Sequence, residues 1–394
     1  MTEVHFENKL KASRIALRIR GKKVKIMKEI VEKITELRHD LHGIPEESMQ
    51  ETKTKQMLEN FLTRNTKLEI EDRGRWFCAV KRGAGKASGK QPIAFRADMD
   101  AVCGKDGKPG HYCGHDGHAA ALAGFALWLD RFEPAEDIYL IFQPAEETGK
   151  GAELCSALLE EKHISHIFGQ HNIPGYPKNH VLIKKGTFAC ASTGLEITMR
   201  GVPSHAGYPE AGRNPGCALA QLLLDTRRLT ERYNREKGFV LMTLIGLDVG
   251  SANYGVSASE GVLRMTVRGE RESVFEEYVN EIRAMAEAAA ARDGLELYIQ
   301  EIERFPATEN YDDACEMVRL AAEENKFAIT CLEEPMRWSE DFGGYLKKTA
   351  GAFFGIGDGE NYPQLHTQDY EFPDEVLETA IKMFAAIATI ENKK

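Results

Sequence analysis

The sequence has no apolar run of the length that a membrane-spanning helix requires. It also lacks internal repeats, low-complexity segments and an N-terminal apolar signal core followed by small residues. We therefore expect a protein of the cytoplasm that does not act in a membrane. The basic segment 1–28 fits a docked extension or a solvated helix better than an arm on a membrane surface.

Regular cysteine spacing is missing as well. The eight cysteines stand at positions 78, 103, 113, 155, 190, 217, 315 and 331, without the short repeated intervals of a disulfide framework. In a chain of this size they indicate free thiols in a reducing compartment, with one of them available as a metal ligand. An excess of positive charge is also absent, since the net charge is −10, and this argues against binding of nucleic acid.

Two adjacent glutamates, Glu146 and Glu147, follow the apolar run 138–142. A run of that length, rich in β-branched and aromatic residues, predicts a buried strand that Pro144 ends. Neighbouring side chains in extended backbone point in opposite directions, so one carboxylate can bind a metal while the other contacts a water. Taken alone, the pair fits a solvated loop equally well.

Three further apolar runs end in carboxylate or imidazole side chains. The runs are 93–97, 166–169 and 352–356. The acids and histidines that follow them are Asp98 and Asp100, then His171, then Asp358 with His366 a few residues later. Open α/β sheets place their sites at the carboxyl ends of strands, so we expect these side chains to meet.

The densest cluster is the sequence Cys-Gly-His-Asp-Gly-His at 113–118, directly before an alanine-rich run that predicts a buried helix. Gly114 lets the Cys113 thiol and the His115 imidazole turn toward one point. Cysteine, histidine and glutamate are the ligands of zinc and similar metals. Asp116 and His118 are better suited to orienting the ligands or capping the helix than to binding metal themselves.

Motifs spread over residues 37 to 370 resemble those of the M20 metallopeptidase family. The similarity is to its amidohydrolase branch, which contains N-acyl-amino-acid amidohydrolases, hippurate hydrolases and auxin-conjugate hydrolases. In chain order the matching segments are LRHDLH at 37–42, PE at 45–46, RADMDA at 96–101, CGHDGH at 113–118, QPAEE at 143–147, GQHNIP at 169–174, GVPSHA at 201–206 and SEDF at 339–342.

The resemblance implies a zinc-peptidase-like α/β catalytic domain, with a mixed central sheet and helices on both faces. It also implies two divalent metal ions per subunit, with zinc, manganese, cobalt and nickel as candidates. The implied ligands are Cys113, His115, Glu147, His171 and His366. Asp98 and Asp100 are expected around this set rather than in it. Glu146 is expected to be the general base that takes a proton from water and passes it to the leaving nitrogen.

The implied reaction is hydrolysis of the amide bond of an N-acyl or N-aroyl amino acid. Departures from the family pattern at 102–104, 214–215 and 255–258 lie in substrate-facing parts, so the substrate stays open. Arg268, in a retained Thr-x-Arg, is expected to bind the substrate carboxylate. A small-dipeptide metallopeptidase is the alternative. A non-catalytic metal-binding relative is disfavoured because both Glu146 and Glu147 are present.

The length of 394 residues exceeds what one core usually covers, so two domains are expected. Residues 190–303 show the order β-α-β-β-α-β, which predicts a ferredoxin-like α+β lid inserted between catalytic segments 1–189 and 304–394. The resemblance implies a homodimer through this lid, with His205 reaching the substrate carbonyl of the partner's site. Residues 99–114 are expected to form a long approach loop, and residues 83–90 a hairpin turn rather than a phosphate loop.

Overall fold

The computed structural model describes residues 25–84, 91–105 and 107–391. Most of the basic segment 1–28 and of the turn 83–90 therefore lies outside the described residues. None of the helices in the described ranges is long and apolar enough to cross a membrane.

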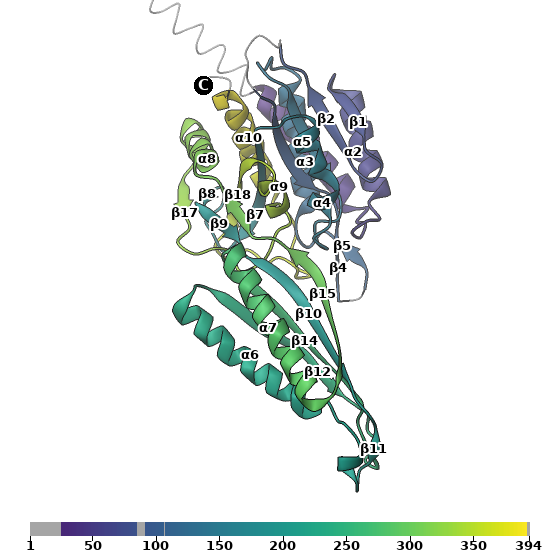
Figure 1. The fold of residues 1–394 in the computed structure, drawn as a ribbon. Helices are drawn as coiled ribbons and strands as arrows, with labels where there is room; N and C mark the ends of the chain where they lie inside the picture. Colours follow the sequence, from purple (N-terminus) through teal and green to yellow (C-terminus); the bar gives the residue numbers. More distant parts are fainter. Residues whose placement is uncertain (1–24, 85–90, 106, 392–394) are drawn as a thin grey trace, which may run out of the picture.

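The largest sheet of the described structure is mixed and has eight strands (Figure 1). Its strand order is β1-β2-β6-β3-β7-β18-β8-β17. Neighbouring strands from β6 to β18 run parallel, as do β8 and β17, whereas β1–β2, β2–β6 and β18–β8 are antiparallel. The strands are β1 (Glu69–Asp72), β2 (Phe77–Lys81), β3 (Ile93–Asp98), β6 (Ile138–Gln143), β7 (His166–Pro174), β8 (Val181–Ile183), β17 (Ile329–Cys331) and β18 (Ala350–Gly359). All four apolar runs that predicted buried strands lie in this sheet.

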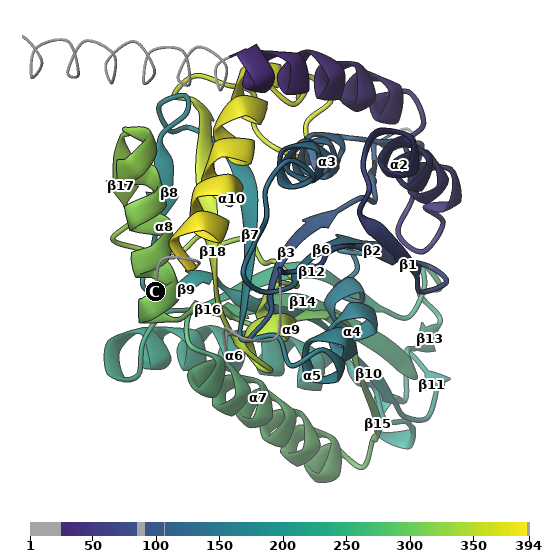
Figure 2. The same ribbon diagram turned by 90° about the horizontal axis from the view of Figure 1, so that it is seen from above.

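Helices cover both faces of this sheet, as Figure 2 shows, with α3 and α10 on one side and α4, α5 and α9 on the other. Along β6, Leu140 and Phe142 enter one core, and Tyr139 and Ile141 enter the other. Burial on both faces explains why the strand is a continuous apolar run rather than an alternating one. The helices are one at 25–42, α2 (Thr52–Asn65), α3 (His115–Leu129), α4 (Gly151–Cys155), α5 (Ala157–Glu161), α8 (Asp312–Asn325), α9 (Gly343–Leu346) and α10 (Leu377–Glu391).

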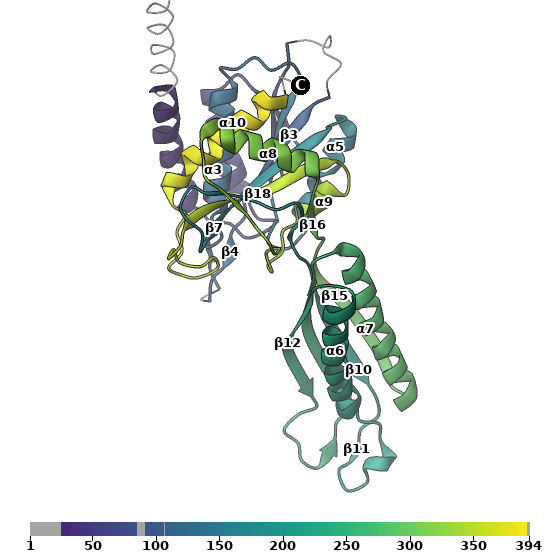
Figure 3. The same cartoon turned by 90° about the vertical axis from the view of Figure 1, so that its left-hand side faces the viewer.

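A second, four-stranded antiparallel sheet extends away from the first (Figure 3), with the order β12-β14-β10-β15. Its elements are β10 (Ala191–Arg200), α6 (Gly216–Glu236), β12 (Val240–Val249), β14 (Glu260–Gly269), α7 (Glu272–Asp293) and β15 (Glu296–Phe305). Both helices pack into one core with this sheet, separate from the two cores of the eight-stranded sheet.

Short elements complete the described fold. They are the strand pairs β4 (Val102–Cys103) with β5 (Pro109–Gly110), β9 (Gly186–Ala189) with β16 (Thr308–Asn310), and β11 (Ser204–His205) with β13 (Val256–Ser257), and the 3-10 turns η1 (Pro209–Ala211) and η2 (Asp374–Val376). The β4–β5 hairpin corrects the expectation of one long loop over 99–114. Gly107, with φ of 74°, supplies the tight turn that lets the Gly104 N–H donate to Lys108 O at 2.8 Å.

The turn after β6, which carries the two glutamates, is held by a buried carboxylate. Ala145 has a φ of 55°, a left-handed conformation that is unfavourable for a residue with a Cβ. Its N–H donates to Glu51 Oε1 at 2.8 Å, and the same oxygen accepts the N–H of Met49, whose φ is 70°. Glu51 is 4% exposed and therefore fixes two left-handed residues next to the site.

Replacing Glu51 tests this support. Glu51→Ala should lower the free energy of unfolding by about 1–3 kcal/mol, because two buried N–H groups lose their acceptor. Glu51→Gln keeps an acceptor oxygen and should cost less. Urea unfolding would measure both variants, with the exposed Glu36→Gln as the control.

The same carboxyl has a signature in pH. Burial raises the pKa of Glu51 from its ordinary 4.5 to about 7. The folded protein therefore keeps the proton on Glu51 at a higher pH than the unfolded chain does. The stability that the protonated Glu51 contributes is lost as pH rises from 4.5 through 7. In chelator-treated protein, Glu51→Gln should show a smaller loss than wild type across this range. An unchanged slope would contradict this account.

Candidate metal centre

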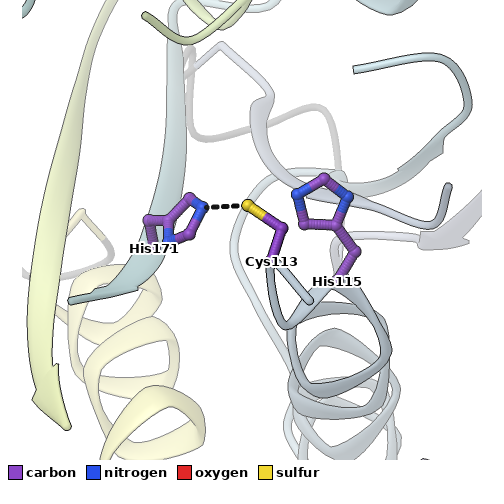
Figure 4. A group of neighbouring side chains, drawn as sticks. All are labelled: Cys113, His115 and His171. Carbon is purple, nitrogen blue, oxygen red and sulfur yellow. Dashed lines mark hydrogen bonds between the residues drawn. The ribbon is translucent and has the colours of Figure 1, made fainter. Parts of the chain in front are cut away.

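Five side chains from four parts of the fold meet near the carboxyl ends of the parallel strands of the eight-stranded sheet. Gly114, with φ of 88°, precedes α3 and turns Cys113 and His115 toward the same space. Figure 4 shows the Cys113 thiol between the imidazoles of His115 and His171. The side chains are Cys113 before α3, His115 at its start, Glu147 after β6, His171 within β7 and His366 in the loop after β18.

The Cys113 sulfur is common to two groups of potential ligands. One group joins it to His115 and His171, and the other joins it to Glu147 and His366. Cys113 Sγ lies 3.4 Å from His171 Nε2 and 3.2 Å from His366 Nε2. Glu147 Oε1 lies 3.5 Å from His366 Nε2 and 3.7 Å from His115 Nε2. The fold therefore brings together all five residues that the sequence pattern suggested as ligands.

Two of these atoms are buried without a hydrogen-bond partner in the described part of the chain, namely His115 Nε2 and Glu147 Oε1. A buried polar atom left unpaired costs about 1–3 kcal/mol, so it needs a partner outside the chain's own atoms. A set of one thiol, imidazoles and a carboxylate matches the ligands of zinc and its borderline neighbours. The residues thus fit two divalent cations.

The ring orientations also suit ligation. His171 Nδ1–H donates to the carbonyl oxygen of Asn172 at 2.6 Å, which leaves Nε2 as an acceptor facing Cys113. His115 Nδ1–H contacts the carbonyl oxygen of Asp100 at 3.1 Å and its carboxylate at 3.2 Å, which leaves Nε2 toward Glu147. Hydrogen bonds of this kind fix the tautomer and the ring plane of metal-binding histidines.

Asp98 and Asp100 lie around this cluster. Asp98 contacts His118 Nδ1 at 2.7 Å, and His118 Nε2 lies 2.6 Å from Asn172 Oδ1, so both ring nitrogens of His118 are occupied within the protein. Asp100 Oδ2 accepts the N–H of Glu147 at 3.0 Å. Each aspartate therefore positions a residue of the cluster or its neighbour.

Acidic groups are crowded here, and their pKa values show it. Burial, then Glu340, Glu147 and Asp341, raises the pKa of Glu146 well above its usual range. Burial and the nearby Glu147 likewise raise the pKa of the Cys113 thiol. Burial instead lowers the pKa of His171, which favours the neutral ring that a metal requires. Bound cations would relieve the repulsion between these carboxylates and a thiolate.

Behind the cluster, Arg96 forms a buried network that the sequence motifs did not reveal as a unit. Arg96 is 1% exposed and donates to Gln143 Oε1 at 2.7 Å, Asp98 Oδ2 at 2.8 Å and Asp341 Oδ1 at 2.8 Å. The Asp341 N–H donates to Glu146 Oε1 at 3.3 Å. An arginine inside an apolar strand was the one local signal, because buried arginine needs carboxylate partners.

A cavity of about 420 Å³ opens beside the cluster. It is lined by Cys113, Glu146, Glu147, His171, Ile173, Pro174, Tyr176, Met336, Trp338, Ser339, Glu340, Gln364, Leu365 and His366. Most of the apolar members were not foreseen, because no local pattern marks Tyr176 or Trp338 as neighbours of His171.

Arg268 and His205 lie outside this cavity. Arg268, on β14, donates to Arg337 O at 3.0 Å and Ser339 Oγ at 2.9 Å, so it lies against the segment that lines the cavity. His205, on β11, is exposed at the far tip of the second sheet (Figure 1). Within one chain the structure therefore does not bring His205 to the metal cluster.

Comparison with known proteins supports the predicted resemblance. N-acetylcysteine deacetylase of Bacillus subtilis is 26% identical over 370 residues, which cover 91% of this chain and 96% of that protein. Hippurate hydrolase of Campylobacter jejuni is 28% identical over 373 residues, which cover 89% and 94%. A dinuclear metal-binding M20 peptidase from Bacillus subtilis has a similar fold, with a TM-score of 0.79 at 24% identity over 93% of this chain and 99% of that one.

Residues 94–390 match the family model, a span that contains all five clustered side chains, Glu146 and the Arg96 network. The resemblance deduced from the motifs is thereby confirmed, and the chain belongs to peptidase family M20/M25/M40.

Proposed function

We propose that this protein is a metal-dependent amidohydrolase that cleaves the amide bond of an N-acyl or N-aroyl amino acid. The observation that carries the proposal is the pair of potential metal-binding groups that have Cys113 in common. Glu146 is buried beside these groups, and a cavity opens next to them. The deacetylase and hippurate hydrolase that resemble this chain carry names of the same reaction class. When bound, two divalent cations would polarise a carbonyl oxygen and acidify a water.

In this proposal Cys113, His115 and His171 would hold one cation, and Cys113, Glu147 and His366 would hold the other. The donor set admits zinc, manganese, cobalt or nickel. Asp98 and Asp100 keep the histidine rings and the Glu147 backbone in place through the hydrogen bonds described above.

Glu146 is proposed to carry the proton. Its Oε2 lies 4.0 Å from His115 Nε2, at the edge of the cluster, and it lines the cavity. From this position the carboxylate can accept a proton from water and give it to the leaving nitrogen. That second transfer is needed because an amide anion is a poor leaving group.

A small-dipeptide peptidase remains the alternative. A dipeptide would carry an ammonium group on the half that contains the cleaved carbonyl, whereas the cavity wall beyond the cluster is largely apolar. A non-catalytic relative has no use for Glu146, because the two groups that contain Cys113 supply the proposed ligands without it. We therefore favour the amidohydrolase. We also propose that it acts in the cytoplasm as a soluble enzyme.

We further propose the domain division 1–189, 190–303 and 304–394, with the middle part as a ferredoxin-like lid. In support, β10 begins at Ala191, β15 ends at Phe305, and the elements between them share a separate core. Two chain connections allow such a unit to hinge and exclude water from the cavity. Arg268 lies at its junction with Ser339, without a carboxylate partner among its hydrogen bonds in the described structure, and is proposed to bind the substrate carboxylate.

The lid is also proposed to form a homodimer through the edge of its sheet. β12 is the terminal strand of the sheet order in the described chain, and it exposes Leu244, Ile245, Leu247 and Val249. The opposite edge, β15, also exposes Tyr298 and Ile302, but it carries Glu296 and Glu301 as well, and charged residues on an edge strand disfavour strand pairing. A dimer of this kind would explain how His205 could act in the partner's site.

Loss of metal is the first test. Incubation with a strong chelator should abolish hydrolysis, and Cys113→Ser and Glu147→Gln should both lower the metal content of purified protein, because each removes a ligand. Metal analysis would measure the content, with the exposed Cys331→Ser as the matched thiol control. Full activity of metal-free protein would contradict the proposal of a metal-dependent amidohydrolase.

The second test separates binding from chemistry. Glu146→Gln should keep the metal content of wild type, since the ligands are unchanged, while kcat falls by about a hundredfold or more. The exposed Glu153→Gln on α4 controls for the loss of a nearby acid. If Glu146→Gln retained most of its kcat, another group would have to be the base.

The third test concerns the dimer. Leu244 is 46% exposed on β12 and Leu154 is 39% exposed on α4, so they form a matched pair. Leu244→Asp should yield monomers in light scattering, because a charge then lies at the proposed contact, whereas Leu154→Asp should not.

Complementation tests the role of His205 in the partner's site. After verified subunit exchange, a mixture of Glu146→Gln and His205→Ala should regain activity in one of the two sites of each mixed dimer. No recovery would mean that each site is built within one chain.

A further inference from the structure

The cavity beside the metal cluster is lined by residues of two chemical kinds. Some are the proposed ligands and Glu146. Others are apolar, and five of them, here called the apolar wall, are Ile173, Tyr176, Met336, Trp338 and Leu365. We propose that the apolar wall binds the acyl half of the substrate, and that this acyl group carries an aromatic ring or an apolar group of similar size rather than being acetyl. This inference rests on the proposed amidohydrolase function.

The apolar wall is built into the fold at its centre. Ile173 lies on β7 two residues after His171 and is 3% exposed. Met336 N–H donates to Phe188 O at 2.7 Å, and the Cys190 N–H contacts Trp338 O at 3.2 Å, so the backbone around Trp338 is held to the β9 segment.

The Trp338 ring is fixed as well. Its centre lies 5.4 Å from the His171 ring and 6.1 Å from the Phe188 ring, the latter in an edge-to-face arrangement at 67°. Trp338 is only half-buried, so part of its ring surface stays open to the cavity. A preformed aromatic surface next to a ligand histidine binds an apolar group at little cost in side-chain entropy.

Charge decides which half of the substrate enters. The described residues that line the cavity include no lysine or arginine, but they include Glu146, Glu147 and Glu340. The described lining therefore offers no cationic side chain to pair with the carboxylate of the amino-acid half. Arg268 lies outside the cavity, bonded to Arg337 O and Ser339 Oγ on either side of Trp338. The amino-acid half therefore points toward the lid, and the acyl half is left with the apolar wall.

The size of the cavity argues for a large acyl group. Its volume is about 420 Å³, within the range of pockets that hold drug-sized ligands, and an acetyl group would leave the apolar wall in contact with water. One methylene in an apolar pocket changes kcat/KM by roughly 10–200-fold. A ring that covers Trp338 should therefore gain at least about tenfold over a methyl group.

Steady-state kinetics with glycine conjugates tests the inference on the metal-loaded enzyme. N-acetylglycine and N-phenylacetylglycine share an aliphatic carbonyl, so their intrinsic reactivity is similar and the acyl group is the main variable. We expect kcat/KM for the phenylacetyl conjugate to exceed that for the acetyl conjugate by about tenfold or more. Trp338→Ala should reduce this ratio several-fold, and Trp128→Ala, which removes a tryptophan outside the cavity, should leave it unchanged. If Trp338→Ala does not fold, Leu365→Ala on the other part of the apolar wall replaces it.

Binding gives a readout that does not depend on turnover. Calorimetry with the Glu146→Gln protein should show tighter binding of N-phenylacetylglycine than of N-acetylglycine, and Trp338→Ala in that background should remove the difference. Preference for acetyl in both measurements would overturn the inference while the amidohydrolase proposal stands. Tighter binding of the phenylacetyl conjugate without cleavage of either would instead overturn the proposed function. Cleavage of dipeptides alone would favour the peptidase alternative and overturn both.

Discussion

The buried guanidinium of Arg96 is the interaction on which the site depends. An arginine with 1% exposure needs several compensating partners, because an unpaired buried charge costs several kcal/mol. Its partners come from strand β3, from the end of β6 and from the segment that contains Glu340 and Asp341. Asp341 in turn accepts the Ala152 N–H at the start of α4. Three distant parts of the chain are thus held at the place where Glu146 leaves the sheet.

A second chain of polar contacts extends from the same network to the loop that carries His366. His118 links Asp98 to Asn172, and the Asn172 amide donates to Asp358 Oδ2 at 2.8 Å. Tyr370 also contacts this amide, and its hydroxyl donates to Asp358 Oδ2 at 3.2 Å. These hydrogen bonds connect the neighbouring strands β7 and β18 with the loop that follows β18. His366, the half-exposed member of the candidate ligands, therefore still has a defined position.

The two sheets therefore have different physical characters. Around the eight-stranded sheet, the networks of Arg96 and His118 contain buried polar groups that pair with one another, which suits a centre that must hold several acids close together. The second sheet leaves apolar side chains of β12 exposed and keeps His205 at its tip, away from the chain's own cluster. The first arrangement can hold metals within one chain, whereas the second is the surface on which the proposed dimer and lid would depend.

The sequence by itself determined the local elements and the identity of the chemistry. Continuous apolar runs predicted β3, β6, β7 and β18, and Cys113, His115 and the Glu146–Glu147 pair pointed to a metal cluster, because residue type and spacing are local properties. Only the tertiary structure decided that Cys113 belongs to both groups of potential metal ligands and that Glu51 supports the turn at Ala145. It also decided that Trp338 faces His171. These facts depend on strand order and on contacts between residues far apart in the chain, which no local periodicity encodes.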